Sequence, residues 1–441
     1  MEPVDTLIYA RWIIPVVPPG RLLHDGAIAI RAGRIVALES RDTAQARFQA
    51  REKVELPGRA LIPGLVNAHT HAAMTLLRGI ADDLPLMEWL NEHIWPRELR
   101  WVDGGFVRVG ATLAVAEMLR SGTTCFADMY FFPDVVRQVA EETGIRARLG
   151  LIFVDFPTPW ARSPEEYFEK NLDLYRQHPG DDRLGWMLAP HAPYSVSDEM
   201  FSRIAGLSNS LDLRVHIHLH ETRHEIEESL DRFQRRPLSR LERLGLVNER
   251  LMAVHMVHLN EDEIDKVAAK GCSVVHCPES NLKLASGFAP VASMDKRGLS
   301  LALGTDGAAS NNDLDLLGEM RTAALLAKGV THDPEVLPAQ RVLSMATLGG
   351  AQALGMEDQI GSLEVGKAAD ITAIDLSAPE NQPVYDPVSQ IVYAAGREHV
   401  TEVWVGGRRL LEEGQLTGVD WPALAEEVAG WQQHLAQPLE K

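Results

Sequence analysis

Two histidines separated by a single residue are the clearest chemical signal in this sequence. The segment Pro63-Gly64-Leu65-Val66-Asn67-Ala68-His69-Thr70-His71 ends an apolar run with His69 and His71. On a β-strand, residues i and i+2 point to the same face, so both imidazoles can reach one metal ion. A second cluster, His216-Ile217-His218-Leu219-His220-Glu221, repeats the alternation, and Asp306 ends a third apolar run. Three or four nitrogen and oxygen ligands from separate strands, with a position left for water, predict a catalytic zinc site.

Alternation alone does not select a ligand from the second cluster. By parity its three histidines share one face, and Glu221 falls on the other unless the strand ends just before it. From its depth in the strand we expect His216 to be a core residue, and we expect His220 to be structural or to support a ligand. Taken alone, His255 fits a core histidine equally well. Within this constellation we expect it beside the metal-bound water.

The elements that must position these side chains alternate between strand-like and helix-like segments over residues 62–360. Eight such βα units close a (β/α)₈ barrel of the TIM type, whose active site lies at the carboxyl ends of the strands. Short strands bounded by Gly and Pro occur before and after this stretch. We therefore expect residues 1–61 and 361–419 to form one small β-sandwich domain, with 420–441 as a helical tail. The expected barrel strands end at His69, Asp128, Asp155, His191, His220, His258, Cys277 and Asp306.

Composition narrows the class of partner. The formal net charge is −19 at pH 7, which argues against nucleic acid, because binding to phosphates needs a basic face. A small neutral or mixed-charge substrate fits better. The start of the chain shows no signal peptide, and no apolar run is long enough to span a membrane. The three cysteines have no paired spacing, so we expect buried thiols and a cytoplasmic protein.

Several longer motifs resemble those of the amidohydrolase superfamily and, within it, the deaminases of 5′-methylthioadenosine and S-adenosylhomocysteine. The resemblance covers nearly the whole chain. The general superfamily motifs are the 63–71 segment and Gly361-Ser362-Leu363-Glu364-Val365-Gly366-Lys367-Ala368-Ala369-Asp370. The more specific motifs are Met74-Thr75-Leu76-Leu77-Arg78-Gly79, Pro190-His191-Ala192-Pro193-Tyr194, Ser280-Asn281-Leu282-Lys283-Leu284 and the 303–312 segment that contains Asp306.

The resemblance implies a role for each candidate residue. It assigns metal binding to His69, His71, His218 and Asp306, and so selects the middle histidine of the second cluster. It assigns proton transfer to Glu221, orientation of the attacking hydroxide to His255, and a catalytic role besides metal binding to Asp306. It assigns substrate contacts to Trp89, Glu98, His191 and Glu221, with Glu98 on the ribose hydroxyls and His191 on the purine. The roles of His216, His220 and His276 stay open.

The resemblance also implies one Zn²⁺ per chain, although the ligand types also suit other divalent metals. Two-metal relatives carry a bridging lysine at the end of the fourth strand, and Leu188-Ala189-Pro190-His191-Ala192 has none. Relatives that accept S-adenosylhomocysteine place two arginines near the third strand. Here one of those positions is Leu151, while Arg162 can supply the other. We therefore expect 5′-methylthioadenosine to be preferred over S-adenosylhomocysteine.

The predicted function is hydrolytic deamination of an adenine nucleoside to its inosine analogue and ammonia, by a metal-activated hydroxide. The nearest alternative keeps this chemistry on another ring, such as guanine, 8-oxoguanine, cytosine or a triazine. A lower-ranked alternative is a barrel scaffold without catalysis, against which the full set of ligands argues. For such barrels we expect a homo-oligomer, a dimer or a tetramer, as the assembly state.

Overall fold

The computed structural model describes residues 1–438, and its central element is a nearly closed barrel of eight parallel strands. The strands neighbour one another in sequence order, as the alternation of βα units predicts. The expected (β/α)₈ fold is confirmed. The barrel strands are β5 (Leu65–Thr70), β6 (Thr123–Asp128), β7 (Arg146–Phe153), β8 (Leu184–Pro190), β9 (Val215–Leu219), β10 (Leu251–His255), β11 (Ser273–His276) and β12 (Ser300–Leu303).

The barrel strands are apolar because both of their faces are covered. Every residue of β6, β8 and β9 is buried, as is typical of parallel sheets enclosed by helices. Gly304 directly follows β12 where this strand approaches β5, and any Cβ there would lie 2.9 Å from His69 Cβ. The absence of a side chain at Gly304 therefore lets the last strand come close to the first, beside a candidate metal ligand.

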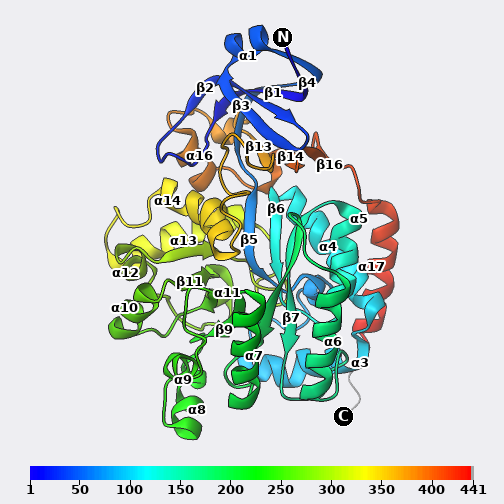
Figure 1. Ribbon diagram of the computed structural model, residues 1–441, viewed down its shortest axis with the longest axis vertical. Coiled ribbons are helices and arrows are strands. Elements are labelled where there is room, and N and C mark those ends of the chain that lie inside the picture. The colour runs from blue at the N-terminus through cyan, green and yellow to red at the C-terminus, as the bar shows by residue number, and fades with distance from the viewer. Residues whose placement is uncertain (439–441) are drawn as a thin grey trace.

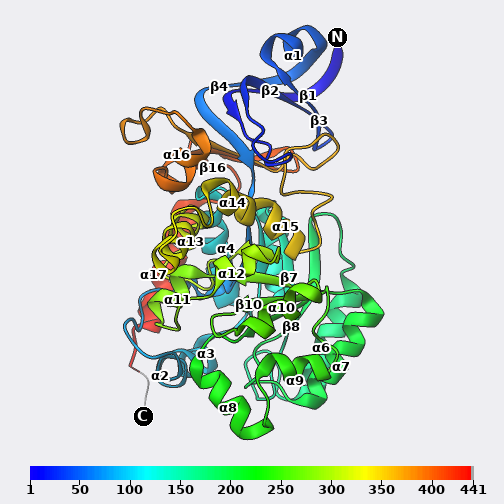
Figure 2. The same ribbon diagram turned by 90° about the vertical axis from the view of Figure 1, so that its left-hand side faces the viewer.

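Helices surround the barrel on its outer side (Figure 1, Figure 2). Six of its eight main helices begin at a residue whose side chain caps the first turn. Asn260 is one example, because its side chain and that of Glu263 form a reciprocal capping box. The main helices are α4 (Gly104–Arg120), α5 (Pro133–Thr143), α6 (Pro164–Gln177), α7 (Asp198–Leu211), α8 (Arg223–Phe233), α9 (Pro237–Arg243), α10 (Glu261–Ala269) and α13 (Leu316–Thr331). No helix of residues 1–438 combines the length and the apolar character needed to cross a membrane.

A short helical segment between β5 and α4 covers the carboxyl ends of the barrel strands. Its residues line a cavity together with side chains from the strand ends. Farther along the chain, α17 (Trp421–Leu435) packs on α4, with Trp431 edge-on to Phe106 at 5.4 Å. The covering segment consists of η1 (Ala72–Leu77), α2 (Leu86–Glu88), η2 (Trp89–Ile94) and α3 (Trp95–Trp101).

The two ends of the chain together form a second, mixed sheet of eight strands in the order β16-β15-β14-β13-β4-β1-β2-β3. In Figure 1 this sheet lies above the barrel, beyond the amino ends of the barrel strands. A buried ion pair links the two parts, since Arg146 at the start of β7 bonds Asp370 at 2.7 and 2.9 Å. The strands are β1 (Glu2–Ile13), β2 (Leu23–Arg31), β3 (Arg34–Ser40), β4 (Phe48–Pro63), β13 (Ile371–Asp375), β14 (Val400–Val405), β15 (Arg408–Glu412) and β16 (Gln415–Leu416).

Candidate active site and metal centre

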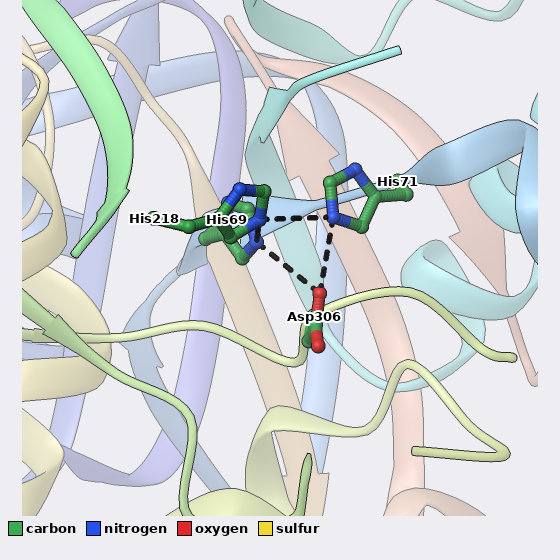
Figure 3. Close-up of side chains that lie close together, drawn as sticks. All are labelled: His69, His71, His218 and Asp306. Carbon is green, nitrogen blue, oxygen red and sulfur yellow. Dashed lines mark hydrogen bonds and ion pairs between the residues drawn. The ribbon is translucent and has the colours of Figure 1, made fainter. Parts of the chain in front are cut away.

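Four side chains converge at the carboxyl ends of the barrel strands, on the side away from the terminal sheet (Figure 3). They are His69 and His71 at the end of β5, His218 in β9 and Asp306 after β12. His218 Nε2 lies 3.2 Å from the Nε2 atoms of His69 and His71. Asp306 Oδ1 lies 3.2 Å from the same two nitrogens. Two ligands of one tetrahedral Zn²⁺ are about 3.3 Å apart, so this spacing fits a single zinc ion.

The tautomers of two of these histidines also fit a metal. His71 Nδ1 donates to the carbonyl oxygen of Met129 at 2.5 Å, and His218 Nδ1 donates to that of His191 at 2.7 Å. A carbonyl oxygen only accepts, so in the neutral rings both protons lie on Nδ1 and both Nε2 atoms carry lone pairs. Lone pairs 3.2 Å apart repel unless a cation lies between them. Backbone carbonyls thus orient both rings as metal ligands.

Further hydrogen bonds hold the remaining two ligands. His216 Nε2 lies 2.9 Å from His69 Nδ1, and this hydrogen bond fixes the orientation of the His69 ring. Asp306 Oδ2 accepts the hydroxyls of Ser280 at 2.7 Å and Ser310 at 2.6 Å, which leaves Oδ1 for the metal. Burial opposes the charge on Asp306, but the two adjacent histidines, His69 and His71, outweigh it and lower the pKa of this carboxyl well below its usual value.

Glu221 and His255 lie beside the metal ligands and face each other. Glu221 Oε2 is 3.9 Å from His255 Nε2, and both side chains are buried. Asn281 Oδ1 lies 2.9 Å from His255 Nδ1, which fixes the ring and leaves Nε2 towards the cavity. Burial raises the pKa of Glu221 above its usual value, although the nearby His255 acts in the opposite direction. Glu221 therefore holds a proton more readily than an exposed glutamate does, which suits it to proton transfer.

Left-handed backbone turns explain how residues after the strands reach the site. His220, His255 and Asp306 have φ values of 54°, 71° and 59°, which non-glycine residues rarely adopt. The turn at His220 ends the alternation of β9, so Glu221 enters the cavity instead of pointing to the opposite face. Such strained residues gather at functional sites when the surrounding structure holds them in place.

A cavity of about 300 Å³ opens beside the metal ligands. Trp89, Glu98 and His191 all line it, together with Glu221 and the three ligands His71, His218 and Asp306. Burial lowers the pKa of His191 to about 3, so this ring is neutral. The structure does not bring Arg162 into the cavity: its side chain is exposed, outside the lining residues, and its backbone N–H donates to Glu166. The expected substrate contact of Arg162 has no support in the geometry.

The histidines whose roles were open lie outside the ligand set. His220 turns away from the metal centre: its Nε2 accepts from the backbone N–H of Leu238 at 3.0 Å, and its Nδ1 is 3.2 Å from the carbonyl oxygen of His258. His276 is buried on the outer side of the barrel and lines a separate cavity of about 210 Å³. Of the three, only His216 touches a candidate ligand directly.

Sequence reasoning assigned no role to four polar residues of the site, Tyr130, Ser280, Asn281 and Ser310, although the last three lie in motifs that carry the resemblance. Tyr130 follows β6 in a loop and donates to Glu98 at 2.6 Å. Ser280 and Asn281 lie in α11 (Pro278–Lys283), directly after β11. Their position after a barrel strand was the available signal, because the loops there build the site in this fold. Nothing in their residue types marked them as partners of Glu98, Asp306 or His255.

Comparison with known proteins adds three findings. A model of the Amidohydrolase family matches residues 60–410. Two relatives are curated as 5-methylthioadenosine/S-adenosylhomocysteine deaminase. The one from Teredinibacter turnerae is 47% identical over 98% of this chain and 98% of its own length. The one from Saccharophagus degradans is 46% identical over 98% of this chain and 96% of its own length.

Solved structures resemble the whole chain. An adenosine deaminase from Xanthomonas campestris with bound zinc has a TM-score of 0.97 and 51% identity, covering 98% of this chain and 99% of its own. An atrazine chlorohydrolase from Arthrobacter aurescens in complex with zinc has a TM-score of 0.90 and 25% identity, covering 97% of this chain and all of its own. Both the curated relatives and these structures therefore match from end to end.

Proposed function

Because this chain belongs to the amidohydrolase family, and to its 5-methylthioadenosine/S-adenosylhomocysteine deaminases, we propose that it deaminates an adenine nucleoside hydrolytically, with 5′-methylthioadenosine as its preferred substrate. The observation that carries this function is the convergence of His69, His71, His218 and Asp306 with an acid, Glu221, at one cavity. The products are the inosine analogue and ammonia.

A bound Zn²⁺ supplies a water molecule whose pKa is lowered to about 7, and so a nucleophile at neutral pH. Glu221 protonates ring nitrogen 1 of the adenine, which makes carbon 6 electrophilic. Its raised pKa supports this role. Asp306 accepts one proton of the attacking water and passes it to the amino group, which leaves as ammonia. The remaining hydroxyl proton returns to Glu221 as the carbonyl group of the product forms. His255 stabilises the developing charge on the attacking oxygen.

Two features of the cavity support the substrate contacts. Glu98 presents a buried carboxylate that suits the ribose hydroxyls, and neutral His191 can hydrogen-bond the purine ring. Leu86, Leu90 and Phe156 contribute apolar surface, while no lysine or arginine of residues 1–438 lines the cavity. A methylthio group needs only apolar contact, whereas the amino-acid carboxylate of S-adenosylhomocysteine needs a cation. The lining therefore favours 5′-methylthioadenosine.

Ammonia release from 5′-methylthioadenosine, S-adenosylhomocysteine, adenosine and guanine tests the proposal, with metal analysis on the same preparation. We expect about one zinc per chain and the highest kcat/KM for 5′-methylthioadenosine. If the enzyme prefers guanine, or a triazine added to the panel, it carries out the same chemistry on a different ring. A preparation that holds zinc but releases ammonia from none of these rings would refute the proposal.

We further propose a cytoplasmic location and a homo-oligomeric assembly for this protein. Cys125, Cys272 and Cys277 are all buried free thiols, which supports a reducing, cytoplasmic compartment. A homo-oligomer, dimer or tetramer, is the assembly we propose, and light scattering on the purified protein would test it.

A further inference from the structure

Tyr130 makes a direct hydrogen bond to the carboxylate to which we assign ribose binding. Its hydroxyl donates to Glu98 Oε1 at 2.6 Å, and both side chains are buried in the cavity wall. Within residues 1–438, no group donates a hydrogen bond to Glu98 Oε2. Oε1 is therefore anchored by the protein, while Oε2 is free to accept a hydrogen bond from a ligand.

This hydrogen bond also joins two separate parts of the fold. Tyr130 lies two residues after β6 in the barrel, whereas Glu98 lies in α3 of the covering segment. From residue 85 to residue 101, the only other side-chain hydrogen bond we find to the rest of the described chain runs from Arg100 to the carbonyl oxygen of Pro438, at the surface. The Tyr130–Glu98 bond is thus the buried polar link that sets where α3 places its carboxylate.

The pKa shifts suit Tyr130 as the fixed donor of this hydrogen bond. Burial and the negative charge of Glu98 raise the pKa of Tyr130 well above its usual value, so the hydroxyl keeps its proton. Burial raises the pKa of Glu98, and the hydrogen bond from Tyr130 opposes this rise only in part. A carboxylate accepts hydrogen bonds only, and ribose hydroxyls can donate them.

We propose that Tyr130 is a positioning residue that holds the Glu98 carboxylate in the orientation that accepts ribose hydroxyls, and that it thereby makes the site selective for ribonucleosides. This inference rests on the proposed function. Removing the Tyr130 hydroxyl leaves Glu98 buried without its partner and free to rotate. The loss of kcat/KM should therefore be confined to substrates that carry ribose hydroxyls.

The test compares adenosine with 2′,3′-dideoxyadenosine, which lacks both hydroxyls, in wild type and Tyr130→Phe. In wild type we expect kcat/KM to favour adenosine by at least about a hundredfold, because buried acceptors reject a ligand without the matching donor. Tyr130→Phe should lower kcat/KM for adenosine by about 10- to 100-fold, mainly through KM, as expected for loss of a charge-assisted hydrogen bond. For dideoxyadenosine the change should stay within about twofold. Where its turnover is too slow, its inhibition constant replaces kcat/KM.

Two further single variants and one double variant separate positioning from general structural damage. Tyr167→Phe is the matched control, because it removes another buried tyrosine hydroxyl, bonded to Thr158 and outside the cavity lining. It should leave the ratio of the two substrates unchanged. Glu98→Gln should reduce the same ratio as Tyr130→Phe does, and the double variant should add little. If Tyr130→Phe does not fold, Glu98→Gln must still lose selectivity between the two substrates.

Each outcome decides between the inference and the function on which it rests. An equal loss of both substrates in Tyr130→Phe would make Tyr130 merely structural and overturn the inference, while deamination itself stands. A wild-type enzyme that treats both substrates alike would overturn it too, because Glu98 would then not contact the ribose. A wild-type enzyme that deaminates no adenine nucleoside would refute the proposed function instead.

Discussion

Replacing Glu221 with glutamine separates proton transfer from metal binding. Glutamine has the same shape, and the backbone N–H of residue 221 stays anchored by the Glu225 carboxylate at 2.8 Å, so the cavity should keep its form. The only function lost is delivery of a proton. General acid catalysis contributes about 10²- to 10⁴-fold in rate, which is about 3–5 kcal/mol of activation free energy. We therefore expect kcat to fall by that factor while the protein keeps its zinc.

The assay is ammonia release under saturating substrate, with zinc measured by mass spectrometry on the same sample. Glu227→Gln is the matched control, because Glu227 is an exposed carboxylate in α8 and its variant should behave as wild type. A Glu221→Gln enzyme with zinc and turnover within about tenfold of wild type would show that Glu221 is not the acid. Loss of zinc in this variant would show instead that Glu221 helps to hold the metal.

Three other perturbations test separate parts of the structure. Arg146→Gln leaves Asp370 buried without its cation, so the free energy of unfolding in urea should fall by about 3–5 kcal/mol; a change under 1 kcal/mol would contradict this. Burial lowers the pKa of His276 to about 3, so its NMR signals should not titrate between pH 8 and pH 5. A midpoint in that range would show an accessible ring. Chelation should abolish activity and lower the unfolding temperature, and added Zn²⁺ should restore both; activity that survives full metal removal would refute the metal site.

The barrel could be predicted because its signal is repeated along the chain. Each strand is an apolar run that ends in a chemically active residue, and the eight runs bring these residues to one end of the barrel. For the metal centre, the two-residue spacing of His69 and His71 was sufficient to place both rings on one face. The choice of His218 within its cluster came only from the resemblance, and the structure brings it within 3.2 Å of both.

The rest of the site depends on backbone geometry and long-range contacts that residue patterns do not encode. Alternation placed Glu221 on the outer face, and only the left-handed turn at His220 brings it inside. The hydrogen bond from Tyr130 to Glu98 joins residues 32 positions apart in loops and short helices. Arg162 lies outside the cavity lining although it follows the third strand closely in sequence, so its substrate contact stays a prediction.

The mixed sheet gives this chain a particular order of assembly. Strand β4 pairs with β1 on one side and with β13 on the other, and β13 lies about three hundred residues further along the chain. During synthesis, one edge of β4 therefore has no hydrogen-bonding partner until the entire barrel has been translated. An interrupted or truncated chain would expose that edge to neighbouring molecules, so aggregation of incomplete chains is the hazard that this architecture carries.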